Sequence, residues 1–224
     1  MSQTVIQILL FAFPAIIAIT LHEAAHGYTA FAFGDDTAKR AGRLTLNPIR
    51  HIDPFGTIIL PALLAATTGF IFGYAKPVPV DTHRLDNPRR DMAIVAAAGP
   101  LTNIALAIFA AFSFFLFLGP ANETPLLWNL FVMSIQLNFV LAVLNLLPLP
   151  PLDGSKVLAA FLPNRLLGSY MRLEPFGFLI LLVLIFLVPA LTAQFGTRIN
   201  VLGWLVGDPA FYLTRSLMTF IGAI

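Results

Sequence analysis

Long apolar runs alternate with short polar stretches along the chain. The first run extends from about Thr4 to Phe33 and ends at Gly34-Asp35-Asp36, a helix breaker followed by two carboxylates. A helix of about 20 apolar residues is enough to span a bilayer. The pattern therefore predicts an all-α polytopic membrane protein with about five to six hydrophobic segments. Beyond the first segment, these are residues 55–72, 92–118, 126–147, 176–191 and 201–224.

Two of these segments are interrupted, and one polar stretch has a different period. Residues 55–72 contain Pro61 and Thr67-Thr68-Gly69, and residues 201–224 contain Gly207-Asp208-Pro209. Between the first two segments, polar and apolar side chains alternate over residues 42–47, which is typical of a strand. We therefore expect a short β-hairpin in that polar stretch.

The composition agrees with a membrane protein. Of the 224 residues, 58% are hydrophobic and 11% are charged, whereas soluble domains carry about 25% charged residues. The net charge is +2, and the basic residues gather in loops, which indicates a solvated membrane face and not nucleic-acid binding. The chain has no cysteine, which excludes disulfides and thiolate metal sites.

Three ionisable side chains lie within the first apolar run, in the pentapeptide His22-Glu23-Ala24-Ala25-His26. Residues four apart share one face of a helix, so both imidazoles can bind one metal ion. The glutamate between them can act on a water molecule bound to that ion. Ionisable groups are costly in a spanning helix and indicate function there. We therefore predict a metal site inside the membrane domain, with Glu23 as its general base.

The charges of the loops predict the sidedness of the chain. Residues 35–54 and 73–91 each contain four Lys or Arg residues, whereas the turn at residues 119–125 contains none. The excess of basic residues places both loops in the cytoplasm. We therefore expect residues 55–72 to enter the membrane and return, as a re-entrant segment buried against other helices.

A catalytic zinc site usually has three protein ligands, of which His22 and His26 supply two. In the topology above, Asp153 reaches the same side of the membrane as the histidines. Taken alone, Asp153 is well suited to cap the helix that follows it, but beside the histidine pair the ligand role is favoured. The other candidates are poorly placed or lie in polar loops: Glu123, Glu174, His51 and His83.

Together these motifs resemble the site-2 proteases, which are intramembrane zinc metallopeptidases. The resemblance rests on the pentapeptide and on Asn145-Leu146-Leu147-Pro148-Leu149-Pro150-Pro151-Leu152-Asp153-Gly154. Two further stretches match the family, Gly42-Arg43-Leu44-Thr45-Leu46-Asn47-Pro48 and Ala98-Gly99-Pro100-Leu101-Thr102-Asn103. The match covers about residues 15–165. We expect a compact form without PDZ or CBS domains.

The resemblance implies a zinc endopeptidase that cuts in or near transmembrane segments of substrate proteins, in regulated intramembrane proteolysis. It implies one Zn²⁺ per chain held by His22, His26 and Asp153, with Glu23 as the general base and Asn145 as a donor to the substrate carbonyl oxygen. The expected partners are transmembrane substrates and the lipid bilayer of a prokaryotic cell membrane, with the active site toward the cytoplasm. We expect one domain over residues 1–224, with a catalytic core at about 4–165 and C-terminal helices at about 175–224.

Some alternatives stay open. Asn145 could instead form an interhelical hydrogen bond, which is the role that we assign first to Asn103. The stretch at residues 43–47 could pair with a substrate as an added strand, or it could form a solvated hairpin. Two other functions stay open: a metalloprotease of another family with a Glu ligand, and a metal-binding transporter or non-catalytic membrane module. A transporter would not require the base Glu23 between two ligands.

Overall fold

The computed structural model of the chain describes residues 3–59, 73–117, 125–197 and 199–224. These residues form helices and connecting turns, and no strand occurs among them. Short 3-10 or π-helical turns occupy Pro48–His51, Pro54–Ile59, Thr82–Arg84, Glu174–Phe176, Val183–Leu187 and Gly203–Gly207. The α-helices are α1 Gln3–Ala32, α2 Thr37–Arg40, α4 Pro88–Phe117, α5 Pro125–Leu146, α6 Asp153–Phe161, α7 Asn164–Met171, α8 Gly177–Leu182, α9 Val188–Ala193 and α10 Asp208–Phe220.

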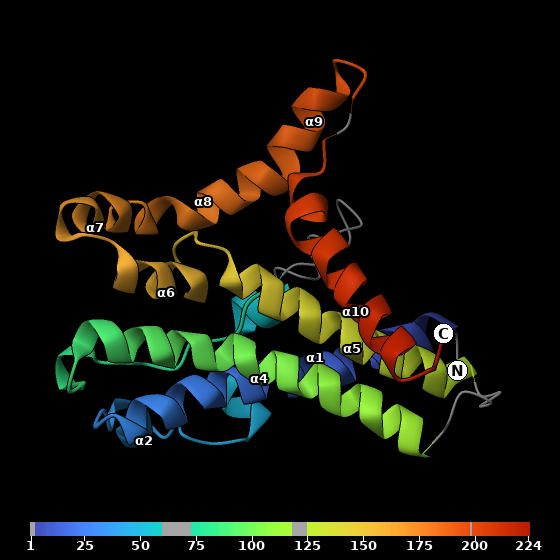
Figure 1. Cartoon of the computed structure of the whole chain (residues 1–224), viewed down its shortest axis with the longest axis horizontal. Helices are drawn as coiled ribbons and strands as arrows, with labels where there is room; N and C mark the ends of the chain where they lie inside the picture. The colour runs from blue at the N-terminus through green and yellow to red at the C-terminus, as the bar shows by residue number, and fades with distance from the viewer. Residues whose placement is uncertain (1–2, 60–72, 118–124, 198) are drawn as a thin grey trace.

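Helices α1, α4 and α5 lie side by side and form the main bundle, while α8 and α9 extend away from it (Figure 1). Four helical stretches are long and apolar enough to cross a membrane: Leu10–Ala32, Pro88–Phe117, Pro125–Leu146 and Asn164–Ala193. The predicted apolar segments at residues 4–33, 92–118, 126–147 and 176–191 correspond to these four. A mostly helical, multi-pass architecture is therefore confirmed.

The predicted count of five to six segments is not supported. The C-terminal stretch at residues 203–220 is helical but is not among the four candidate spans. Asp208, Arg215 and several hydroxyl side chains interrupt its apolar sequence, and such groups are unfavourable in lipid. Helix α10 packs along α5. The predicted re-entrant segment at residues 55–72 lies largely outside the described residues.

The predicted β-hairpin at residues 42–47 is wrong. Thr45 Oγ1 accepts a hydrogen bond from the Asn47 N–H at 3.1 Å, and Asn47 Oδ1 accepts one from the Ile49 N–H at 3.1 Å. These side-chain oxygens hold the backbone in turns and compete with a strand ladder. The Arg43 guanidinium instead donates to the Lys76 carbonyl oxygen at 2.7 Å.

The core of the bundle lies where α10 covers α4 and α5. Helix α4 contributes three alanines and one phenylalanine to it: Ala107, Ala110, Ala111 and Phe114. Small side chains let membrane helices approach closely, so dispersion contacts can replace the hydrophobic effect that lipid lacks. Ile135 and Phe139 of α5 complete this cluster with Ala210, Met218 and Ile221.

The end of α1 is fixed by its capping residues. Gly34 adopts a φ of +96°, and the Asp35 N–H donates to the Ala30 carbonyl at 3.0 Å, as in a Schellman cap. Asp35 then binds the segment that leads into α4, because its Oδ2 accepts from the Asp81 N–H at 2.7 Å. The chain therefore enters α4 at the same end of the bundle at which it leaves α1 (Figure 1).

Asp35 is expected to stabilise this junction as a carboxylate. Burial raises the pKa of Asp35, but hydrogen bonds from Thr37 and Asp81 and the nearby Arg84 charge lower it by more. The net result is a pKa below the ordinary value. Asp35→Asn places an amide donor against the Asp81 N–H and should cost about 1–3 kcal/mol of stability. The Asp35 contribution is present above the unfolded pKa of about 4 and is lost as pH falls through the lower folded value.

Thermal unfolding of purified protein in detergent, followed from pH 7 to pH 3, measures this effect. The difference between wild type and Asp35→Asn should shrink below about pH 4. The exposed Asp86→Asn is the matched control and should unfold like the wild type. An equal loss in both variants, or a difference that grows in acid, would contradict the role of Asp35.

Candidate metal centre

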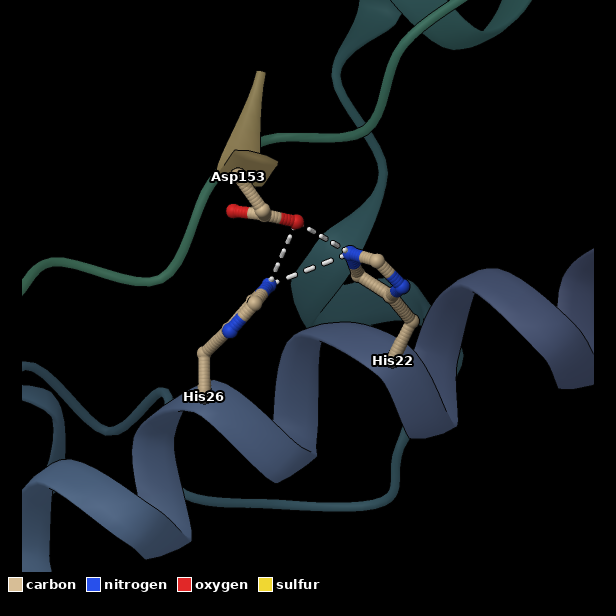
Figure 2. Close-up of side chains that lie close together, drawn as sticks. All are labelled: His22, His26 and Asp153. Atoms are coloured by element: carbon tan, nitrogen blue, oxygen red, sulfur yellow. Dashed lines mark hydrogen bonds and ion pairs between the residues drawn. The ribbon is translucent and has the colours of Figure 1, made fainter. Parts of the chain in front are cut away.

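Three buried side chains converge between α1 and the start of α6. Figure 2 shows that His22 and His26 project from one face of α1 toward the carboxylate of Asp153. The two Nε2 atoms are 3.0 Å apart, and Asp153 Oδ2 lies 3.2 Å from His22 Nε2 and 3.3 Å from His26 Nε2. The helical spacing of four residues and the break after α5 therefore bring the three ligand atoms together.

The other nitrogen of each imidazole is held by α4. His22 Nδ1 donates to Asn103 Oδ1 at 2.6 Å, and His26 Nδ1 donates to the Val95 carbonyl oxygen at 2.7 Å. A neutral imidazole with its proton on Nδ1 presents a lone pair on Nε2. Both Nε2 lone pairs therefore face Asp153, in the arrangement that metal-binding histidines usually have.

This donor set fits a zinc ion. Two nitrogen lone pairs and a carboxylate oxygen at such short separations repel one another unless a cation lies among them. Zinc bonds of about 2.0–2.1 Å in a tetrahedron place the ligand atoms about 3.3–3.4 Å apart, close to the observed triangle. Two imidazoles and one carboxylate also form the kind of ligand set that catalytic zinc sites use.

Asp153 is the first residue of α6 and not its cap, since Leu152 occupies the N-cap position. Asp153 is instead buried against the two imidazoles. A carboxylate at the first turn of a helix also interacts favourably with the helix dipole. The helix-cap role, which the sequence favoured only for Asp153 taken alone, is therefore not the one observed.

Two glycines make room for the site. A Cβ atom on Gly99 of α4 would lie 2.5 Å from His26 Nε2 and 2.6 Å from His22 Nε2, within the space that the ligand atoms face. A Cβ atom on Gly154 would overlap the carbonyl oxygens of Leu146 and Leu147. Glycine therefore lets α4 approach the ligands and lets α6 start directly beneath the end of α5.

The remaining predicted site residues make other contacts. Glu23 Oε2 accepts a hydrogen bond from the Val78 N–H at 2.9 Å, so the segment before α4 holds this carboxylate. Asn145 Nδ2 donates to the Leu141 carbonyl oxygen of its own helix at 3.0 Å. Among the alternative ligands, His51 is buried and pairs with the Thr45 carbonyl at 2.9 Å, whereas His83 is exposed.

Sequence reasoning missed Asn138, the Val95 carbonyl and the contact of Val78 with Glu23. Of these, only Asn138 could have been noticed in the sequence, because an amide within an apolar spanning helix needs a partner. The two main-chain groups could not, since every residue has a main chain. Asn103, which the sequence assigned first to packing that could also steady the site, contacts His22 directly.

A sequence profile described as "Peptidase family M50" matches residues 10–125 and 119–188, which is most of the chain. The chain belongs to peptidase family M50. This is the site-2 protease family, so the resemblance seen in the motifs is confirmed, and the protein is a zinc metallopeptidase.

Several curated proteins are similar over much of their length. "Putative zinc metalloprotease YwhC" of Bacillus subtilis is 42% identical over 174 residues, which cover 75% of this chain and 76% of that protein. "Putative zinc metalloprotease Rip2" of Mycolicibacterium smegmatis is 34% identical over 180 residues, 80% of this chain and 67% of that protein. A shorter match, 45% over 64 residues, links 29% of this chain to 31% of "Putative zinc metalloprotease MJ0611" of Methanocaldococcus jannaschii. No solved structure matches the chain.

Proposed function

We propose that this M50 peptidase cleaves peptide bonds in or near transmembrane segments of other membrane proteins. The observation that carries the proposal is the position of the metal ligands within the membrane domain. His22 and His26 lie inside Leu10–Ala32, a stretch apolar and long enough to span a bilayer, and both are buried. A peptidase whose site lies in such a helix acts on chains that reach the same depth.

His22, His26 and Asp153 would hold one zinc ion. Zinc, when bound, lowers the pKa of a water molecule that it coordinates and so provides a nucleophile near neutral pH. We assign the proton of the attacking water to Glu23. Its Oε2 is held by the Val78 N–H, so Oε1 is the atom that takes the proton and can return it to the leaving amine.

We assign Asn145 to the substrate carbonyl oxygen, which gains negative charge as the water attacks. Its Nδ2 carries two N–H groups, of which one is used by the Leu141 carbonyl, so the second can donate to the substrate. Asn145 precedes the break that leads to Asp153, which supports a position near the reacting bond. The hydrogen bond that Asn145 makes lies within its own helix and not between helices.

We further propose that the site faces the cytoplasm of a prokaryotic cell and belongs to a single membrane domain. Both polar stretches that flank residues 55–72 carry four Lys or Arg residues, and the turn at residues 119–125 carries none. The ion pair between Arg84 and Asp36, at 3.0 Å, lies at the junction of the two stretches. This contact joins the two stretches, which supports a common side of the membrane for both.

The proposal is tested with purified protein in liposomes and a single-span helical substrate. Wild type should cleave within the span, lose activity to a zinc chelator and regain it with Zn²⁺. Asp153→Ala should lower both bound zinc and cleavage, because the two histidines alone leave the ion with too few protein ligands. Cleavage of soluble peptides but not of the single-span substrate would reject intramembrane proteolysis at this site. Full activity of Asp153→Ala would reject it as well.

A further inference from the structure

Two asparagines connect His22 to helix α5 through the middle of the bundle. Asn103 of α4 accepts from His22 Nδ1 at 2.6 Å and donates through its Nδ2 to Asn138 Oδ1 at 3.0 Å. Asn138 in turn donates to the Ser134 carbonyl oxygen at 2.9 Å. Asn103 is 0% exposed and Asn138 is 2% exposed, so water does not compete for these bonds.

The direction of this hydrogen-bonded chain is fixed at its far end. A backbone carbonyl can only accept, so the oxygen of Ser134 requires the amide nitrogen of Asn138 to face it. Asn138 Oδ1 is then turned toward Asn103 and requires the nitrogen of that amide. The Ala18 carbonyl oxygen, 3.4 Å from Asn103 Nδ2, favours the same orientation. Asn103 Oδ1 is left facing His22 and requires a proton on His22 Nδ1.

We propose that Asn138, acting through Asn103, is a positioning residue that selects the metal-binding tautomer of His22. With the proton held on Nδ1, the lone pair of His22 lies on Nε2 and faces the metal site. His26 does not depend on such a chain, because a main-chain carbonyl, that of Val95, accepts its Nδ1 proton directly. The proposal rests on the zinc site of the proposed function and not on the nature of the substrate.

The row of hydrogen bonds from Ser134 to His22 is needed because an amide has nearly the same shape in its two orientations. Without the acceptor of Asn138, the side chain of Asn103 can turn over and present its N–H groups to His22 Nδ1. His22 Nδ1 must then be the acceptor, and the proton moves to Nε2, which can no longer bind a metal. Loss of Asn138 should therefore weaken zinc binding although Asn138 does not contact His22.

The test measures the zinc affinity of metal-free protein by competition with a chelator at constant pH. Asn138→Leu and Asn103→Leu should each weaken zinc binding by about 10-fold to 100-fold, as losses of outer hydrogen bonds to metal ligands do. The double variant should bind zinc no more weakly than Asn103→Leu, since Asn138 acts only through Asn103. The control is Asn129→Leu, the same change at an exposed position of α5, which should bind zinc as the wild type does.

Unchanged affinity in Asn138→Leu, or losses that simply add in the double variant, would overturn the proposal. A lower unfolding temperature of the metal-free protein without a change in zinc affinity would overturn it as well, because it shows only a structural role. Should Asn138→Leu not fold, Asn138→Asp decides the question. A neutral buried acid keeps one acceptor for Asn103 and one O–H donor for Ser134, so near wild-type affinity is expected. A large loss of zinc affinity in Asn138→Asp would refute the proposed direction of the hydrogen bonds from Asn138 to His22.

Discussion

Replacement of Glu23 with glutamine is expected to slow cleavage of a transmembrane substrate by a factor of about 10² to 10⁴ without loss of zinc. Glutamine has the size of glutamate, and its carbonyl oxygen can still accept the hydrogen bond from the Val78 N–H. The segment before α4 should therefore keep its place. The amide nitrogen that replaces the second oxygen cannot take a proton from water, so only the chemical step is affected.

Single-turnover cleavage in liposomes, measured together with zinc content per chain, tests this expectation. The control is Glu174→Gln, which makes the same change at an exposed position in the turn before α8 and should cleave at the wild-type rate. Full activity of Glu23→Gln would remove the general base from the mechanism. Loss of zinc from this variant would instead show that Glu23 supports the ligands.

Gly99→Ala is expected to lower zinc affinity by at least about 100-fold, a loss at the upper end of that seen for changes around metal ligands. The added methyl group would lie 2.5–2.6 Å from the Nε2 atoms of His26 and His22, where the ligand lone pairs point. Either the imidazoles move apart or the methyl group occupies the position of the ion. Alanine is also the better helix former, so loss of helix is not the expected cause.

Zinc-dependent thermal stabilisation gives a second measure of this variant, because a ligand that binds only the folded state raises the unfolding temperature. Wild type should gain stability on addition of zinc, and Gly99→Ala should gain almost none. Gly168→Ala in α7 is the matched control, since its Cβ atom would meet nothing within 4 Å. Wild-type zinc stabilisation in Gly99→Ala would mean that the ion does not lie beside α4.

The helices and the histidine pair could be predicted because their signals are local. Apolar runs of 16 to 30 residues predicted the four spans, with ends within a few residues for α1, α4 and α5. The spacing of His22 and His26 places them on one helix face whatever surrounds that helix. By contrast, the predicted strand at residues 42–47 failed, because side-chain hydrogen bonds of Thr45 and Asn47 outweighed the alternating pattern.

The sequence by itself therefore determined the class of protein and the family, and it identified a candidate pair of metal ligands and the candidate base Glu23. It favoured Asp153 as the third ligand only through a predicted topology, and it gave no sign that Asn138 contacts Asn103. Only the tertiary structure shows that Asp153 meets both histidines and that Asn138 contacts Asn103, because these contacts join distant segments. His22 and Asn103 are 81 residues apart, and Asn103 and Asn138 are 35 apart. Packing of α1, α4 and α5, which local periodicity does not encode, brings such groups into contact.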